Sequence, residues 1–511
     1  MADWTGGYVT EVDYTHGYFR ELNPARVALT FSHAGLVHPE VGMACELGFG
    51  QGISINIHAA ASKVAWYGTD FNPSQAGFAM RLAGASAAGT ALCDEAFADY
   101  AQRKDLPDFD FIGLHGIWSW ISDENRVVIV DFIRRKLKVG GVLYISYNTM
   151  PGWAPVVPVR DLLIEYADAM LAPAVGSINR MEAALGFAEK LMATNPAFVR
   201  ANPKIPKFLE SLKSKDRNYL VHEYFNRNWL PMSFSRMANW LSEAKLSYAC
   251  SANYLDGVDS VNLLSDQQDF LNKIPDALFR EGMRDYMVNQ NFRRDYWVKG
   301  PRRLKPGEQV GALRRQKVIL TTHRQDVPLK VKGAQGEAAL NELINNPILD
   351  LLSDHKPRTL DEIEQVVSGK GIAFNQVVQS VMTLIGADQL TVAQDESIVA
   401  IAKNHTDKLN DHFLRMALCG HHVDHLASPV TGEGVALGRT TQLFLLAANQ
   451  GEMQPAEWAQ FVWQTLAAQG QKLIKEGKTL ETPEANLAEL TAQAQTFAEK
   501  QLPILKALQI A

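Results

Sequence analysis

Cysteine is scarce in this sequence of 511 residues, which contains only Cys45, Cys93, Cys250 and Cys419. These residues lie far apart and form no Cys-x-x-Cys pair, so we expect no disulfide framework and a reducing compartment. No apolar run approaches the roughly 18 residues that a membrane helix needs. The first residues also lack the basic and apolar regions of a secretory signal. Together these absences predict a cytoplasmic protein with no membrane insertion.

An excess of charge of one sign is also absent, because 50 Lys and Arg residues face 56 Asp and Glu residues, for a net charge of −6. This balance gives no global attraction to nucleic acid or to anionic membranes, so nucleic acid is not the expected partner. Residues 293–317 are locally basic, with nine Lys or Arg and two acids. We expect a solvated connection with salt bridges there, and the alternative is a grip on RNA or on an acidic protein.

Strand and helix patterns alternate between residues 43 and 148. Short apolar segments predict strands at 43–47, 64–71, 109–116 and 142–148, and a weaker one at 90–97. The segments between them have helical composition. This alternation predicts the α/β class, with a Rossmann-like, doubly wound and mainly parallel sheet that binds its ligand at the carboxyl ends of the strands.

The sequence pattern changes near residue 150, where three prolines within 151–158 end the alternation of strand and helix segments. Beyond that point a mainly helical pattern is followed, at 340–395, by three helical segments and a short strand, the outline of a winged helix. A chain of this length exceeds one core. We therefore predict a catalytic domain at 1–160, a mainly helical domain at 161–300, a basic connecting segment at 301–335, and a winged-helix-like and helical C-terminal region at 336–511.

A glycine-rich turn follows the first predicted strand, with Gly48, Gly50 and Gly52 at alternate positions. Glycines between a strand and a helix let the backbone turn tightly and approach a ligand closely. The dinucleotide pattern Gly-x-Gly-x-x-Gly would require a third glycine where the chain has Ile53. Because this match fails, S-adenosylmethionine is the better candidate ligand.

Two carboxylates accompany the glycine turn. Asp70 ends the second predicted strand, where a carboxylate can accept hydrogen bonds from both hydroxyls of a ribose. Glu46 stands two residues before the first glycine, at a place that is usually apolar in a dinucleotide fold. This acid favours an S-adenosylmethionine site over a dinucleotide site.

These segments resemble a known family. ELGFGQG (46–52) and YGTDFNP (67–73) look like motifs I and II of class I S-adenosylmethionine-dependent methyltransferases. FDFIGLHGIWSWIS, YISYNTMPGW and NYLVHEYFNRNW are similar to a bacterial subgroup that carries a methyltransferase regulatory domain and includes the outer-membrane-protein lysine methyltransferases. The resemblance implies S-adenosylmethionine as the methyl donor, a protein substrate that presents lysine, and a homodimer contact through the regulatory or C-terminal domain.

The resemblance also implies roles for individual residues. The glycines and Glu46 would line the methionine and ribose, and Asp70 would hold the ribose. Around the adenine the family places an aromatic residue, an acid and a small residue. The implied cofactor-binding residues are Glu46, Gly48, Gly50, Gly52, Asp70, Phe71, Glu95, Ala96 and His115, with Asp94 as the alternative to Glu95.

A lysine nucleophile has a pKa of about 10.4 in water, so it must lose a proton before it attacks. Polar residues at the ends of the fourth and fifth predicted strands are the candidates to orient or deprotonate it, and an aromatic slot would favour its neutral form. A structural role stays open for His115, and a core position for Trp120. The predicted catalytic residues are Tyr147, His115 and Asn148, and the predicted pocket walls are Trp118, Trp120 and Trp153.

Two further clusters carry reactive side chains. His222, Glu223 and Tyr224 can reach over the catalytic rim as a lid, although buried hydrogen bonding between helices is the expected role. The segment from Cys419 to His425 has metal-ligating residue types, but no second cluster supports it, so we predict no metal site.

Other functions share these features. The same fold methylates small molecules, biosynthetic peptides and RNA, so each of these acceptors is an alternative. A second alternative is a non-catalytic regulator that senses S-adenosylmethionine and binds DNA. The segment 340–395 is not basic, which argues against that regulator.

Overall fold

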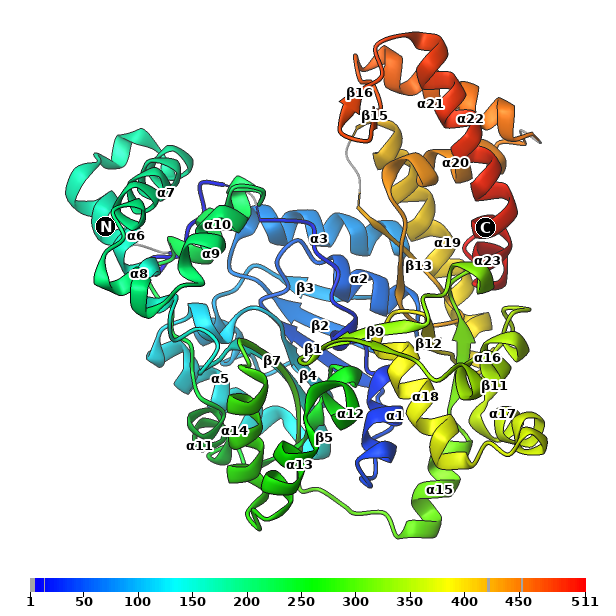
Figure 1. The fold of residues 1–511 in the computed structure, drawn as a ribbon, viewed down its shortest axis with the longest axis horizontal. Coiled ribbons are helices and arrows are strands. Elements are labelled where there is room, and N and C mark those ends of the chain that lie inside the picture. Colours follow the sequence, from blue (N-terminus) through cyan, green and yellow to red (C-terminus); the bar gives the residue numbers. More distant parts are fainter. Residues whose placement is uncertain (1–4, 13, 421–422, 452–453) are drawn as a thin grey trace.

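A seven-stranded sheet lies at the centre of the protein, in a computed structural model that describes residues 5–12, 14–420, 423–451 and 454–511 (Figure 1). The strand order is β3-β2-β1-β4-β5-β7-β6, in which the first five strands are parallel and β7 is antiparallel to both of its neighbours. The predicted α/β class with a mainly parallel sheet is therefore confirmed. The strands are β1 (Met43–Leu47), β2 (Ala65–Thr69), β3 (Ala91–Cys93), β4 (Phe109–Leu114), β5 (Leu137–Asn148), β6 (Leu246–Ser251) and β7 (Phe292–Lys299).

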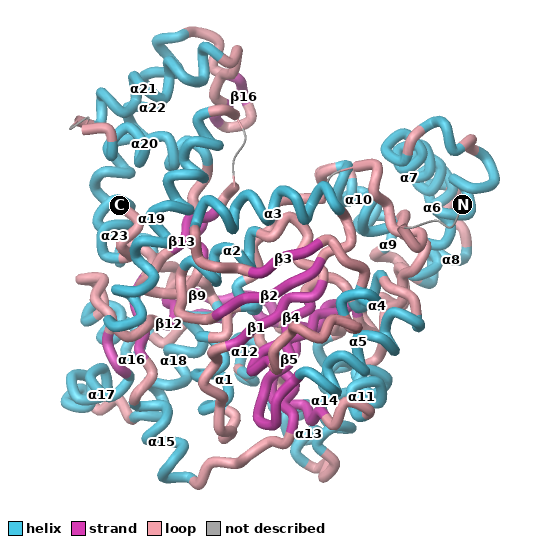
Figure 2. The backbone as a smooth tube through the Cα atoms, turned by 180° about the vertical axis from the view of Figure 1, so that it is seen from behind, coloured by secondary structure: helices cyan, strands magenta, loops and turns pink. Residues whose placement is uncertain are grey.

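Helices cover both faces of the sheet. Successive side chains of a strand point to opposite faces, so each strand contributes apolar side chains to two cores. On one face, Phe111, Tyr144 and Tyr296 pack against helices α1 (Ala25–His33), α2 (Ile53–Ala60) and α3 (Pro73–Ser86). On the other face, Ile112, Ile145 and Trp297 pack against a second group of helices, seen from behind in Figure 2. The second group is α4 (Phe97–Tyr100), α5 (Asp123–Lys136) and α11 (Phe234–Ser242), and α14 (Ala277–Val288) packs on α11.

The sheet continues past the boundary predicted at residue 160. Strands β6 and β7 come from the range 161–300, and β7 pairs with β5 from Val142↔Val298 to Asn148↔Phe292. The helical part of that range is an insertion between β5 and β6, which forms the lobe on the left of Figure 1. Its helices are α6 (Val157–Met170), α7 (Ser177–Ala193), α8 (Ala197–Ala201), α9 (Ile205–Leu212) and α10 (Arg217–Tyr224).

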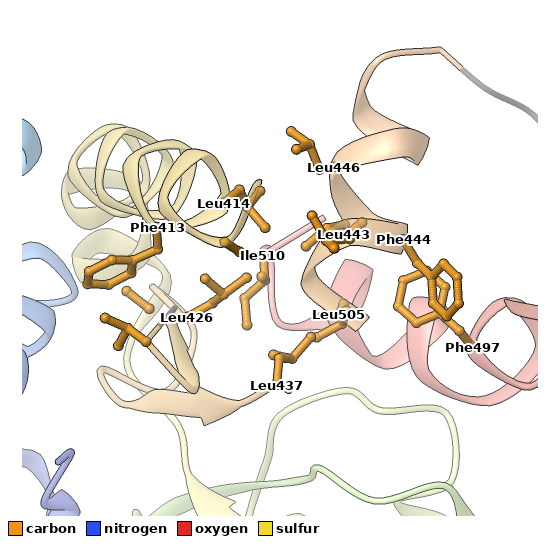
Figure 3. Close-up of a cluster of buried hydrophobic side chains, with 14 of the residues drawn as sticks. Phe413, Leu414, Leu426, Leu437, Leu443, Phe444, Leu446, Phe497, Leu505 and Ile510 are labelled. Carbon is orange, nitrogen blue, oxygen red and sulfur yellow. The ribbon is translucent and has the colours of Figure 1, made fainter. Parts of the chain in front are cut away.

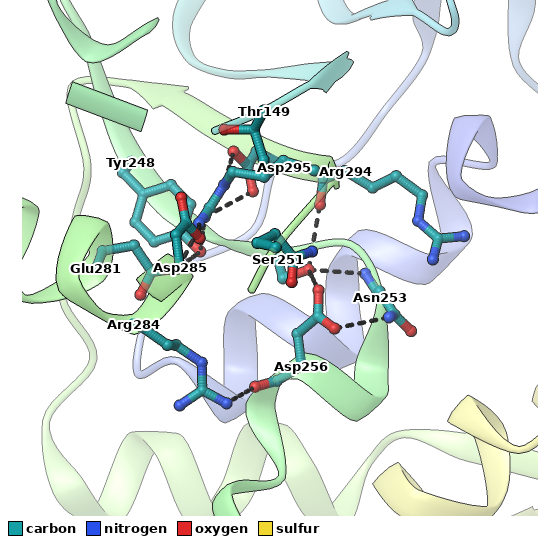
Figure 4. Close-up of polar contacts among 12 residues, drawn as sticks. Thr149, Tyr248, Ser251, Asn253, Asp256, Glu281, Arg284, Asp285, Arg294 and Asp295 are labelled. Carbon is teal, nitrogen blue, oxygen red and sulfur yellow. Dashed lines mark hydrogen bonds and ion pairs between the residues drawn. The ribbon is translucent and has the colours of Figure 1, made fainter. Parts of the chain in front are cut away.

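Strand β7 forms the start of the basic stretch 293–317. The charges of its two arginines are neutralised by acidic side chains. Arg293 is buried and donates hydrogen bonds to Asp285 at 2.5 Å, to Glu281 at 2.8 Å and to Asp295 at 2.8 Å (Figure 4). Arg294 donates to Glu21 at 2.7 Å. The stretch therefore starts as a strand inside the sheet, and not as a solvated connection.

Between β6 and the C-terminal region, short elements surround the edge of the sheet. They are α12 (Asp259–Asn262), α13 (Ser265–Asn272), α15 (Pro306–Arg314), β9 (Lys330–Gly333) and β10 (Gly336–Ala339). A small antiparallel sheet of order β11-β8-β12 then packs with three helices, and its interpretation as a winged helix stays a prediction. These elements are β8 (Lys317–Leu320), α16 (Glu342–Leu351), β11 (Arg358–Thr359), α17 (Leu360–Val367), α18 (Phe374–Gly386) and β12 (Leu390–Val392).

The remaining chain forms a helical unit that packs on helices α2 and α3, which cover one face of the central sheet. Its apolar core, shown in part in Figure 3, also includes Ile53 and Ile57 of α2 and Leu82 of α3. None of the helices formed by the described residues has the length and apolarity that crossing a bilayer requires. The elements are α19 (Glu396–Leu418), β13 (His425–Ala427), β14 (Gly434–Ala436), α20 (Arg439–Asn449), α21 (Pro455–Ala468), β15 (Ile474–Lys475), β16 (Lys478–Thr479), α22 (Pro483–Thr496) and α23 (Leu502–Ala507).

Candidate active site

A pocket lies at the carboxyl ends of β1, β2 and β4, the edge at which parallel sheets bind their ligands. The sheet and the turns that follow its strands form one wall. Tyr8 and residues 14–19 of the N-terminal segment, the start of α3, and the end of α10 with Asn226 form the rest. Six of the residues predicted from the sequence line this pocket, namely Glu46, Gly48, Gly50, Asp70, His115 and Trp120.

The glycine turn holds a left-handed backbone, with φ of 74° at Gly48 and 70° at Gly52. A Cβ atom on Gly48 would lie 2.4 Å from a carbon of Ile117, so only glycine fits there. Gly52 is not among the residues that line the pocket, and a Cβ on it would lie 2.4 Å from the Cβ of Ala79. Gly52 therefore allows α2 and α3 to pack closely.

Asp70 is buried beside the glycine turn. Its Oδ2 accepts a hydrogen bond from the backbone N–H of Gly50 at 2.8 Å, and its Oδ1 accepts one from that of Asn72 at 3.0 Å. Burial raises the pKa of Asp70 to about 6, although the two N–H groups act in the opposite direction. Each carboxylate oxygen keeps acceptor capacity for a ligand hydroxyl.

Glu46 is also buried, and its Oε2 has no hydrogen-bond partner within the protein. Burial, and secondarily the charge of Asp70, raise the pKa of Glu46 well above its usual range. A buried carboxylate oxygen without a partner is costly unless a ligand supplies a donor. The residues present thus fit a ligand with hydroxyl and cationic groups.

His115 directly follows β4, and its ring contacts the side chains of Tyr144 and Phe19. Its Nδ1 lies 2.8 Å from the hydroxyl of Tyr144, and its ring stacks on Phe19 with centroids 3.6 Å apart. Burial lowers the pKa of His115 to about 4, with Arg294 acting in the same direction and Glu21 against it. The imidazole is therefore neutral at pH 7 and is a weak base.

The structure does not bring Tyr147 to the pocket. Its side chain is buried in the core on the α5 side of the sheet, and its hydroxyl donates to Oδ2 of Asp295 at 2.9 Å. The pleat of β5 places Tyr144, not Tyr147, on the side of His115. Asn148 does not line the pocket either, but its Nδ2 lies 3.5 Å from Oε1 of Glu223, which does.

Of the three predicted wall tryptophans, Trp120 lines the pocket and donates through Nε1 to the backbone oxygen of Glu223 at 3.4 Å. Trp118 is buried, with its ring 5.8 Å from that of Trp240. Trp153 packs on Trp229 with ring centroids 5.3 Å apart. Neither Trp118 nor Trp153 is among the lining residues.

The residues predicted at the adenine edge lie beside the pocket and not in its lining. Phe71 makes an edge contact with Tyr8 at 5.6 Å. Glu95 lies 3.4 Å from Arg103, and its backbone oxygen accepts from Thr69 at 2.5 Å. Ala96 is exposed at the start of α4. Their roles toward an adenine stay predictions.

Sequence reasoning missed one contributor to the pocket and gave a second one only as the alternative interpretation. The N-terminal segment supplies Tyr8, Tyr14 and Phe19, for which no motif gave a signal. Helix α10 supplies His222 and Glu223, from the cluster that we assigned to hydrogen bonding between helices. The contact of His222 is with the N-terminal segment and not with another helix, because its Nε2 lies 3.0 Å from the backbone oxygen of Val12.

The segment from Cys419 to His425 does not form a metal centre in the part of the chain that the structure describes. His421 and His422 lie outside the described residues. Within the described residues, no group of three or more His, Cys, Asp or Glu side chains is placed to hold a metal ion. His425 instead packs on Tyr18, with ring centroids 4.8 Å apart.

Comparisons with known proteins agree with this geometry. The uncharacterized protein sll1526 of Synechocystis is 40% identical over 514 residues, which cover 99% of each chain. A family model described as a predicted methyltransferase regulatory domain matches residues 216–299, the range that contains Glu223, β6 and β7.

Two solved structures of PKMT2 from Rickettsia typhi share the fold at 14% identity. The complex with AdoHcy has a TM-score of 0.69 and covers 95% of this chain and 98% of its own. The other structure has a TM-score of 0.68 and covers 97% and 99%. The chain therefore belongs to the family of the Synechocystis protein, and it has the class I S-adenosylmethionine-dependent methyltransferase fold with a methyltransferase regulatory domain.

Proposed function

We propose that this protein is an S-adenosylmethionine-dependent methyltransferase that acts on lysine side chains of a protein substrate. The observation that carries the proposal is the charge of the pocket. Glu46, Asp70 and Glu223 line it, whereas no lysine or arginine does so among the described residues. A pocket with three carboxyl groups and no cation suits a ligand that carries positive charge.

The donor matches this pocket chemically. When bound, S-adenosylmethionine supplies a methyl group already activated by a sulfonium. Asp70 would accept hydrogen bonds from the ribose hydroxyls, and Glu46 would accept from the ammonium of the methionine portion. The glycine turn lets the backbone approach the ligand, and Phe19, Tyr14 and Trp120 exclude water from the reacting groups.

Two observations support lysine as the acceptor. The sequence resembles the outer-membrane-protein lysine methyltransferases, whose acceptor is a lysine side chain. The pocket also combines carboxylates with aromatic rings, which attract both ammonium and methylammonium groups.

Calorimetry on an Asp70→Ala variant tests the donor site. We expect the affinity for S-adenosylmethionine to fall by about 100-fold, because hydrogen bonds to a charged group contribute about 1.5–3 kcal/mol each. Asp99→Ala, which removes an exposed acid on α4, should bind as the wild type does. An Asp70→Ala variant that keeps wild-type affinity, or a wild type that prefers NAD, would contradict the proposal.

Incubation of a cell lysate with tritium-labelled donor and the purified enzyme tests the acceptor. Label on lysine in the protein fraction is the expected result. Label found only in RNA, in small molecules or in peptides would replace the lysine proposal with the corresponding alternative. Donor binding without any transfer of label would favour a sensor over an enzyme.

A further inference from the structure

Glu223 is the one pocket carboxylate that the donor site leaves without a role. It comes from α10, in the range of the regulatory domain, and not from the sheet that carries the glycine turn. Two contacts fix it over the end of β5. Asn148 donates toward its Oε1 at 3.5 Å, and Trp120 donates to its backbone oxygen at 3.4 Å.

No lysine or arginine of the described residues acts on the charge of Glu223. The N-terminal segment contributes Tyr14, β5 contributes the amide of Asn148, and α10 contributes two tyrosines and His222. Across the pocket lie two further carboxyl groups and an imidazole with a depressed pKa. The facing groups are Tyr14, Asn148, Tyr219, His222 and Tyr224, and across the pocket Glu46, Asp70 and His115.

The half-buried carboxylate of Glu223 has no lysine or arginine partner in the described protein, so a cationic group of a ligand would stabilise it. Burial raises the pKa of Glu223 to about 7, and the hydrogen bond from Asn148 acts against that shift. A base with a pKa near the working pH takes up protons most effectively. His115, with a pKa of about 4, is a poorer acceptor for a proton from an ammonium group.

Resting on the methyl transfer proposed above, we propose that Glu223 binds the ε-ammonium of the substrate lysine and accepts its proton. Tyr14 and Trp120 form aromatic walls of the same pocket. The carboxylate oxygen of Glu223 takes one proton from the ammonium and leaves a neutral amine. The amine lone pair then forms the N–C bond to the methyl carbon while the C–S bond breaks and its electron pair goes to sulfur. Glu223 returns its proton to solvent.

The pH dependence of methyl transfer by Glu223→Gln tests this role. For the wild type, kcat/KM should rise with pH and level off near pH 7, where Glu223 becomes ionised. The variant depends on lysine that is already neutral, which is about 0.04% of the side chain at pH 7 for a pKa of about 10.4. We therefore expect at least a 100-fold loss at pH 7, and a rise of about tenfold per pH unit up to about pH 10.

Two matched variants complete the test. Glu243→Gln removes an exposed carboxylate of the same domain and should keep the wild-type profile. Glu223→Asp should keep the wild-type break in the profile at a reduced rate. The affinity of Glu223→Gln for S-adenosylmethionine should stay within threefold of the wild type, which also reports that the variant is folded.

A readout independent of turnover is the infrared band of the protonated carboxyl group. A band lost in Glu223→Gln should titrate near pH 7 in the wild type without added donor. A Glu223→Gln variant whose pH profile keeps the wild-type shape would overturn the role of Glu223 and leave the proposed function intact. A wild type that binds no donor and transfers no methyl would overturn the proposed function and this inference with it.

Discussion

Two tyrosines on β5 lie on opposite faces of the sheet and have different partners. Tyr144 contacts His115 at the pocket, whereas Tyr147, three residues later, points to the opposite face and bonds to Asp295. Asp295 also accepts hydrogen bonds from Arg293 in the buried network of β7. Tyr147 is therefore a member of a buried polar network and does not line the pocket.

A Tyr147→Phe variant separates these two roles. The substitution leaves one oxygen of Asp295 with fewer donors, so we expect the free energy of unfolding to fall by about 1–3 kcal/mol. The kcat of the folded enzyme should stay within about twofold of the wild type. Urea denaturation and initial rates measure the two quantities, and Tyr286→Phe, at an exposed tyrosine, is the control. Unchanged stability with a tenfold lower kcat would restore the catalytic role that the sequence suggested.

At the scale of elements, residues 5–12 and 14–19 are held across the pocket by contacts with α10, the residues just after it, and α2. The N–H of Val9 donates to Oδ1 of Asn226 at 2.9 Å, and the N–H of Phe19 donates to Ser54 at 2.8 Å. Tyr8 and Tyr14 pack on the ring of His222 at 5.4 and 5.1 Å. Because this segment lines the pocket, we expect its attachment to the protein to control the dissociation rate of a bound ligand.

Asn226→Ala tests that control. Loss of the bond to Val9 should loosen the segment and raise the dissociation rate of S-adenosylmethionine about tenfold, equivalent to about 1.4 kcal/mol. Stopped-flow tryptophan fluorescence measures the rate, and hydrogen exchange at residues 5–19 should increase. Asn239→Ala, at an exposed asparagine of α11, should change neither. Faster dissociation with unchanged exchange would mean that Asn226 acts through direct contact with the ligand.

Sequence reasoning succeeded for features that are local in the chain and failed for those that are distant. The strand, glycine turn and acid of residues 43–70 lie close together, so their pattern predicted the pocket wall that the structure shows. The contacts of Val9 with Asn226 and of β5 with β7 join residues separated by more than 100 positions, and no periodicity reports such pairs. The sequence also did not predict which residues of β5 face the pocket side of the sheet. Several residues at a strand end are equally good candidates for that side until the register of the strand is known.

At the scale of the whole molecule, the C-terminal region is tied to the catalytic sheet by a buried ion pair. Arg26 of α1 donates to Oε1 of Glu433 at 3.0 Å, and both side chains are at most 5% exposed. Glu433 also accepts from the hydroxyl of Thr391 on β12 at 2.8 Å, and Arg26 lies over the ring of Tyr254 at 4.5 Å. Segments that are about 400 residues apart in sequence therefore share buried polar contacts, which include the hydrogen bond from Nδ2 of Asn23 to the backbone oxygen of Gly432 at 3.1 Å.

Because that contact is buried, removing one partner leaves the other as an uncompensated charge. Arg26→Met should lower the free energy of unfolding by about 3–5 kcal/mol, whereas Arg26→Met combined with Glu433→Leu should recover more than half of the loss. Urea denaturation measures both, and Lys330→Met, which breaks the exposed pair with Glu337, should cost less than about 1 kcal/mol. If Arg26→Met lost no stability, the apolar contacts with α2 and α3 and the remaining hydrogen bonds would suffice to hold the C-terminal region. We expect instead that the two parts are strongly coupled, so that the central sheet and the C-terminal helices unfold as one unit. A substitution far from the pocket should then reduce methyl-donor binding only because it reduces the fraction of folded protein.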